Sequence, residues 1–121
     1  DAPCSGLGTV RRDPDIRWRR LPSDFPALAE VQLDLLRRAR AHIKPAGRIV
    51  YSTCSSEPEE NEAVVARFLD EAPEFGVLPL DASGVPAGIA RMRTVDGYLR
   101  TSPVHGLEAF FAAVLLRSES A

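Results

Sequence analysis

The chain has two cysteines, and both lie among residues that form turns and begin helices. Cys4 stands in DAPCSG, residues 1–6, and Cys54 stands in YSTCSSEPEENE, residues 51–62. A cysteine thiolate can attack an electron-poor carbon and leave it again, exchange with a disulfide, or bind a metal. An isolated cysteine is more often a small buried apolar residue, and the number of cysteines alone does not decide between these roles.

Other chemistry for the two thiols is less well supported by their spacing. No CxxC or HxxxH pattern joins the cysteines to His42 and His105, so no metal site is expected. A dithiol redox pair remains open, and it predicts a reversible disulfide between Cys4 and Cys54.

The composition is that of one ordinary soluble domain. The chain has 121 residues, of which 45% are apolar and 26% charged, enough to build a compact core. No apolar run approaches the roughly 20 residues that a bilayer crossing needs, and no secretion signal is evident. A cytoplasmic location without a membrane partner is therefore expected, and in that reducing compartment the thiols should be free.

Charge is distributed unevenly along the chain. A net charge of −2 argues against binding of nucleic acid by bulk charge. Yet one segment, residues 11–20, contains Trp18 and five arginines, Arg11, Arg12, Arg17, Arg19 and Arg20. Arginine suits phosphates and stacked bases, so this segment is a candidate RNA contact. A solvated basic loop, with Trp18 as a core residue, is the alternative.

The elements that must position the thiols follow from periodicity and from turn residues. Residues 25–44 have a helical pattern, and Pro45 and Gly47 end it. The apolar members of that pattern are Leu28, Val31, Leu35, Leu36, Ala39 and Ile43. Residues 48–53 (RIVYST) then read as a short buried strand that delivers Cys54 at its carboxyl end.

A second helix is expected over residues 58–72, with Ser56 as its cap and Glu59 completing a capping box. Its core positions are Val64, Val65, Phe68 and Leu69. Beyond it we expect a strand at 75–80, a loop at 81–96, a short extended piece at 98–101 and a buried strand at 109–117, for which a short buried helix is the alternative. The alternation predicts an α/β sheet, in which ligands gather at the carboxyl ends of strands.

Several stretches together resemble one enzyme family. DAPCSGLG (1–8) and YSTCSSEPEENE (51–62) are similar to the two cysteine motifs of the Sun/Fmu-type RNA cytosine-C5 methyltransferases. RDPDIRW (12–18), QLDLL (32–36) and HGLEAFF (105–111) resemble the family's intervening and closing segments, although residues 106–109 depart from its usual GTDGFF pattern. The resemblance covers nearly the whole chain.

This resemblance implies the carboxyl-terminal half of a Rossmann-like class I S-adenosylmethionine-dependent methyltransferase fold, with an incomplete sheet. In the family the cofactor-binding half precedes the DAPC motif, and we expect residues 1–121 to lack it. Cofactor binding by this chain alone should then be weak or undetectable, and the chain alone inactive. Without its usual neighbour, strand 48–53 would be an exposed edge able to pair with a second copy in a homodimer.

The resemblance also assigns roles. Cys54 would be the nucleophile that bonds to C6 of cytosine, since C5 is too poor a nucleophile to attack a methyl donor unaided. Cys4 would help release the product, Asp1 would hydrogen-bond the base, and Pro3 would border the S-adenosylmethionine. When the target base flips out of its stack, the neighbouring nucleotides would be held by Arg11, Arg12, Arg17 and Trp18.

Three questions stay open at this point. DNA cytosine methyltransferases use a Pro-Cys cysteine for attack, so Cys4 is the rival nucleophile. The helix start favours a Cys54 thiolate by roughly 0.3 to 1 kcal/mol, whereas Glu57, Glu59 and Glu60 oppose it, so the net sign is open. The expected function is an RNA (cytosine-5-)methyltransferase acting on rRNA or tRNA; the alternative is a non-catalytic RNA- or partner-binding module of the same fold.

Overall fold

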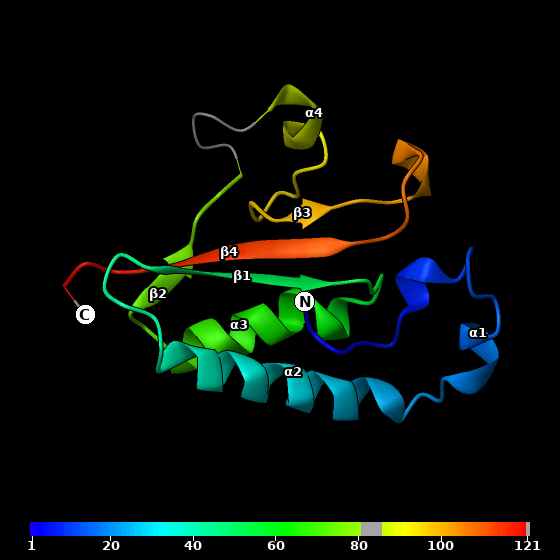
Figure 1. Ribbon diagram of the computed structural model, residues 1–121, viewed down its shortest axis with the longest axis horizontal. Coiled ribbons are helices and arrows are strands. Elements are labelled where there is room, and N and C mark those ends of the chain that lie inside the picture. Colours follow the sequence, from blue (N-terminus) through cyan, green and yellow to red (C-terminus); the bar gives the residue numbers. More distant parts are fainter. Residues whose placement is uncertain (81–85, 121) are drawn as a thin grey trace.

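The computed structural model describes residues 1–80 and 86–120 and has an α/β fold (Figure 1). Three single turns of 3-10 helix occur at Leu7–Thr9, Pro58–Glu60 and Pro103–His105. The α-helices are α1 (Ile16–Arg19), α2 (Asp24–Arg40), α3 (Glu62–Glu71) and α4 (Ala87–Ala90). The strands are β1 (Arg48–Thr53), β2 (Phe75–Val77), β3 (Leu99–Arg100) and β4 (Phe111–Arg117).

Strand β4 is the centre of the sheet. It pairs antiparallel with β1 along one edge, where Thr53 lies opposite Phe111, and with β2 and β3 along the other. Helices α2 and α3 pack together beneath the sheet, while α4 lies above it (Figure 1). Cys54 therefore directly follows β1, a strand that is held in place by its pairing with β4.

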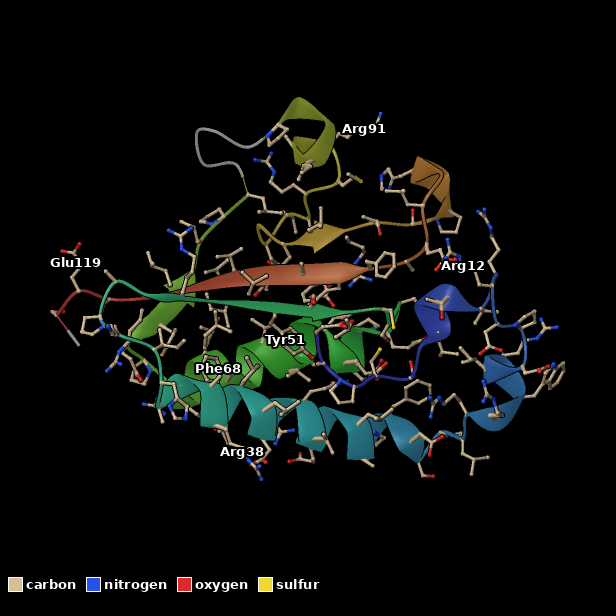
Figure 2. All side chains as sticks on the ribbon, in the orientation of Figure 1. Arg12, Arg38, Tyr51, Phe68, Arg91 and Glu119 are labelled. Carbon is tan, nitrogen blue, oxygen red and sulfur yellow. The ribbon has the colours of Figure 1, made fainter. Side chains whose placement is uncertain are left out.

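The hydrophobic core lies between the sheet and the helix pair. Alternate residues of β4 point into it, so Phe111, Ala113 and Leu115 are buried. Opposite them, α3 contributes its buried face, and Tyr51 of β1 extends toward the helix that carries Phe68 (Figure 2). Both Tyr51 and Tyr98 pack edge-on against the Phe111 ring. This packing holds β1, and with it the start of the Cys54 loop.

The predicted strand at 48–53 is confirmed with the same bounds, but its burial is not, because β1 lies at an edge of the sheet and Val50 is exposed. The strand at 109–117 is confirmed over Phe111–Arg117. The helix predicted at 25–44 is also confirmed, but α2 ends at Arg40. Its buried face is Ala29, Gln32, Leu33 and Leu36, whereas Val31 and Leu35 are 47% and 42% exposed.

The start of the second helix differs from the prediction. Residues 58–60 form a 3-10 turn and α3 begins only at Glu62, with no side-chain cap at Asn61. The Ser56 and Glu59 capping box is therefore wrong, and Glu60, not Glu59, is the buried glutamate. The strand predicted at 75–80 is shorter, at Phe75–Val77. The loop predicted at 81–96 lies partly outside the described residues, and α4 occupies part of the rest.

None of the helices in the described part of the chain is both long and apolar enough to cross a membrane.

The outer edge of β1 generates a prediction about assembly. There Ala2 N–H donates to the Ser52 carbonyl at 2.9 Å, and in an antiparallel ladder alternate residues face the same way. The backbone groups of Arg48 and Val50 therefore face outward too, and Val50 is 60% exposed. Open edges of this kind pair with other chains.

We predict that the chain self-associates through β1. Val50→Lys should weaken this association about tenfold, because pairing of two β1 edges would bring a lysine on one chain close to the same lysine on the other. Sedimentation velocity over a range of concentrations measures it, with Val104→Lys, at an exposed position outside the sheet, as the matched control. A single monomeric species at high concentration would contradict the prediction.

Candidate active site

The two cysteine loops lie against each other. Cys4 Sγ and Cys54 Sγ are 3.1 Å apart although the residues are 50 positions apart in the sequence. Both are free thiols, and both are partly exposed. The loops are joined along their backbones, since Gly8 N–H donates to the Cys54 carbonyl at 2.9 Å. One small molecule or one base could therefore meet both sulfurs.

One buried carboxylate, that of Glu60, joins the two loops. It accepts hydrogen bonds from Ser5 N–H and Ser5 Oγ, both at 2.7 Å, and from Ser55 Oγ. Gln32 Nε2 donates to it at 3.2 Å and to the Pro3 carbonyl at 2.9 Å. Glu60, Ser5 and Gln32 are each 0% exposed. Each serine immediately follows one of the cysteines, so the Glu60 carboxylate holds the two cysteine-bearing loops together.

The end of β1 holds Glu60 in place. Tyr51 OH donates to the Glu60 carbonyl at 2.6 Å. Thr53 Oγ1 bonds to Asn61 Oδ1 at 2.5 Å, and Asn61 Nδ2 donates to the Ser55 carbonyl at 2.9 Å. Alternate side chains of the strand therefore fix the turn that precedes α3.

Gly8 allows a third segment to approach Cys54. A Cβ at this position would lie 2.0 Å from the Ala109 carbonyl oxygen and 2.6 Å from that of Cys54. Ala109 N–H in turn donates to the Gly8 carbonyl at 3.1 Å. Any residue other than glycine would push these backbones apart, so Gly8 sets the position of the 105–111 segment beside the Cys54 loop.

Arg20 supports the Cys4 loop from the basic segment. Its Nε donates to the Ser5 carbonyl at 2.8 Å. Sequence reasoning placed Arg20 only within a basic stretch and missed this role, as it missed Gly8, Gln32 and Glu60. The repeated Cys-Ser pair was the one signal in the sequence that could have pointed to a shared partner.

The rest of the basic segment lies at the surface. Trp18 is 75% exposed, so its interpretation as a core residue is wrong. The Arg17 guanidinium lies 4.9 Å from the centre of the Trp18 ring. Arg12 pairs with Glu108 at 2.8 Å, at the α1 end of the molecule (Figure 2). Arg11 and Arg12 line a hollow of about 240 Å³ with Gly106, Leu107, Glu108 and Phe110.

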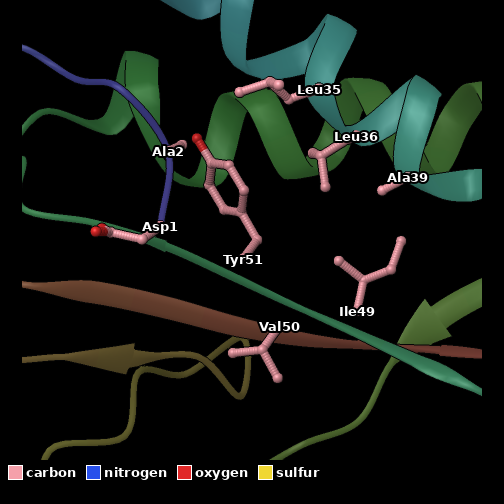
Figure 3. Close-up of a pocket in the computed structure, with 8 residues that line it drawn as sticks. All are labelled: Asp1, Ala2, Leu35, Leu36, Ala39, Ile49, Val50 and Tyr51. Carbon is pink, nitrogen blue, oxygen red and sulfur yellow. The ribbon is translucent and has the colours of Figure 1, made fainter.

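Asp1 and Pro3 are less closely tied to the thiols. Asp1 is exposed and lines a hollow of about 260 Å³ between β1 and α2, whose lining residues do not include either cysteine (Figure 3). Pro3 is exposed, and its carbonyl accepts the Gln32 hydrogen bond. The base-binding role of Asp1 and the cofactor contact of Pro3 stay predictions. In the described residues, no group of three or more His, Cys, Asp or Glu could hold a metal ion.

Burial is the main influence on the Cys54 thiol. It raises the pKa of Cys54 to about 11, and the hydrogen bond and charge of Cys4 and the charge of Glu60 act in the same direction. Of the three glutamates considered in the sequence, Glu60 is the one that contributes to this shift, and the net effect on Cys54 is against the thiolate. In the RNA-free chain the Cys54 thiol is protonated at neutral pH.

We predict that Cys54 is alkylated slowly in the folded chain. A raised pKa means a smaller thiolate fraction at every pH below about 11. At pH 8, iodoacetamide should therefore modify Cys54 in the folded chain more slowly than in the urea-unfolded chain, by a factor of roughly ten or more. The rate in the folded chain should increase as the pH approaches 11. Cys4→Ala should speed the reaction, because it removes one cause of the shift. Peptide mapping follows the rate, and equal rates in the folded and unfolded chains would contradict the prediction.

Comparisons with known proteins find relatives over almost the whole chain. A Klebsiella pneumoniae protein named ribosomal RNA small subunit methyltransferase B is 46% identical over 117 residues, which cover 97% of this chain and 25% of that protein. The chain thus spans about a quarter of the length of that curated relative.

Two solved structures from Pyrococcus horikoshii are also similar. A methyltransferase homologue superposes with a TM-score of 0.72 at 33% identity, covering 97% of this chain and 37% of that one. NSun6, solved with SFG, gives 0.73 at 28% identity, covering 97% and 28%. The structure neighbours have the Rossmann-like methyltransferase fold, which confirms the expected fold class. The family model described as 16S rRNA methyltransferase RsmB/F matches residues 1–116, and the chain belongs to this methyltransferase family.

Proposed function

We propose that this chain carries the cysteine-bearing part of an S-adenosylmethionine-dependent RNA (cytosine-5-)methyltransferase that acts on ribosomal RNA. The observation that carries the proposal is the pair of thiols 3.1 Å apart at the end of β1. The name of the Klebsiella pneumoniae relative favours ribosomal over transfer RNA as substrate. A cytoplasmic location is part of the same proposal.

Cys54 is the nucleophile in this proposal. Its Sγ bonds to C6 of a flipped-out cytosine, which makes C5 electron-rich enough to take up a methyl group. S-adenosylmethionine, when bound, supplies that methyl group and a positively charged sulfonium. A base then removes the C5 proton, and elimination breaks the Cys54–C6 bond. Since the thiol is protonated in the free chain, its ionisation must accompany the binding of RNA or cofactor.

Cys4 assists the release step. At 3.1 Å from Cys54 Sγ its thiol can reach the same base without a movement of the loops. Asp1 and Pro3 lie on the same stretch of chain as Cys4, with exposed side chains that fit the border of a base and cofactor site. We propose that most of the cofactor site lies in the part of the relatives that this chain does not span.

The nucleotides around the target bind the basic segment. Trp18 offers an exposed ring on which a base can stack, and Arg11, Arg12 and Arg17 offer charge to phosphates. The Arg17 guanidinium over the Trp18 ring orders that ring in advance.

Trp18→Ala should weaken binding of a single-stranded RNA by the chain about fivefold or more, since one base–ring stack is worth about 1–3 kcal/mol. Fluorescence anisotropy with a labelled oligonucleotide at low salt measures the affinity. Val104→Ala removes another exposed apolar side chain, outside the basic segment, and serves as the control. Equal affinities for the original chain and Trp18→Ala would remove Trp18 from the interface.

The covalent mechanism is tested in a chimera. This chain replaces the matching quarter of the Klebsiella pneumoniae relative, and the product is given S-adenosylmethionine and RNA containing 5-fluorocytosine, from which C5 elimination is blocked. We expect a protein–RNA adduct that survives denaturing gels in the chimera without further substitution and in its Cys4→Ala variant. The Cys54→Ala variant of the chimera should form no adduct.

Each other outcome has a meaning. An adduct lost only in Cys4→Ala would make Cys4 the nucleophile. No adduct in any chimera, with the unaltered relative reacting normally, would contradict the catalytic proposal and favour a non-catalytic RNA-binding module.

A further inference from the structure

We propose that Glu60 is a positioning residue that sets the spacing of the two thiols, by holding the serine after each cysteine on one buried carboxylate. This rests on the proposed function only in its consequence for catalysis. The spacing itself is a property of the chain and is tested separately.

The acceptor capacity of the Glu60 carboxylate is fully used. Its Oε1 receives Ser5 N–H and Gln32 Nε2, and its Oε2 receives Ser5 Oγ and Ser55 Oγ. An ionised carboxylate offers about four such positions and no donor. All four donors therefore converge on a group that only an acidic residue of this length supplies.

The two serines make the arrangement specific to the thiols. Ser5 and Ser55 are 0% and 1% exposed, and each is the immediate neighbour of a cysteine. Separating the loops would leave buried donors without acceptors and a buried charge without partners, both of which are strongly unfavourable. The pairing of Cys4 with Cys54 is therefore maintained by Glu60 and does not depend on a bond between the sulfurs.

Glu60 acts at a distance from any substrate. It is 0% exposed, so RNA cannot touch it, and Tyr51 OH fixes its backbone at 2.6 Å. A loss of spacing should lower turnover while leaving RNA affinity unchanged. That division separates positioning from substrate binding.

The spacing can be read by disulfide exchange in the 121-residue chain itself. Glutathione disulfide oxidises the thiol pair to a Cys4–Cys54 disulfide and is reduced to two glutathione molecules, so the equilibrium constant gives the effective concentration of one thiol at the other. We expect Glu60→Asp, which keeps the charge but is one methylene shorter, to lower that effective concentration at least tenfold. Glu60→Gln keeps the length and should lower it less, because the serine hydroxyls can turn to donate to, or accept from, the amide.

Glu59→Gln alters the exposed neighbouring glutamate and is the matched control. Circular dichroism establishes that each variant is folded. If a Glu60 variant does not fold, Ser5→Ala and Ser55→Ala each remove one arm of the arrangement and should lower the effective concentration severalfold. An unchanged exchange constant in folded Glu60→Asp, or in both serine variants, would overturn the proposal.

The catalytic consequence is measured in the chimera described above. Glu60→Asp should lower kcat at least tenfold with KM for RNA unchanged, and Glu59→Gln should alter neither. A fall in kcat/KM that comes only from KM would contradict a positioning role. If the chimera has no methyltransferase activity, the proposed function fails, while the exchange measurement still decides the role of Glu60.

Discussion

The candidate site depends on one carboxylate, that of Glu60, which is buried between two loops. A charge in that position is stable only when its lone pairs are filled by donors. Glu60 meets the condition with hydrogen bonds from Ser5, Ser55 and Gln32. Parting of the loops would remove donors from the buried carboxylate, which is unfavourable, and the thiols lie 3.1 Å apart.

The surrounding fold supports this point from several sides. Strand β1 presents Tyr51 and Thr53 to the turn that carries Glu60, and α2 presents Gln32 from its buried face. Gly8 lets the chain before β4 lie against the Cys54 loop. The same burial and the same carboxylate raise the pKa of Cys54. The close spacing of the two thiols thus goes together with a raised pKa of Cys54 in the free chain.

The elements that could be predicted from the sequence are those with a local cause. The β-branched run of β1, the apolar run of β4 and the helical period of α2 predict these three elements, and the structure has all of them. Which side chains are buried was predicted less well, since Val50, Val31 and Leu35 are exposed. The start of α3 could not be placed, because the Ser56 and Glu59 spacing fits a capping box, whereas the structure buries Glu60 through contacts with Ser5 and Ser55 that the local sequence does not indicate. The exposure of Trp18 could not be predicted either, because the residues around it in the sequence do not distinguish an exposed tryptophan from a buried one.

The motifs reached further than periodicity did. Two similar cysteine stretches indicated one family, which the comparison over residues 1–116 confirms, and the structure brings both sulfurs together. The supporting residues Gly8, Arg20 and Gln32 carry no such signal, because each acts through one contact with a segment distant in the sequence.

The account depends most directly on which sulfur bonds to the base. In the chimera with Cys4 replaced by serine, given RNA with ordinary cytosine and S-adenosylmethionine, the release step is impaired and the covalent intermediate should accumulate. Proteolysis and mass spectrometry locate the modified residue. The account predicts methylcytidine attached to the peptide that contains Cys54, whereas normal turnover without a trapped intermediate, or attachment at another residue, would contradict it.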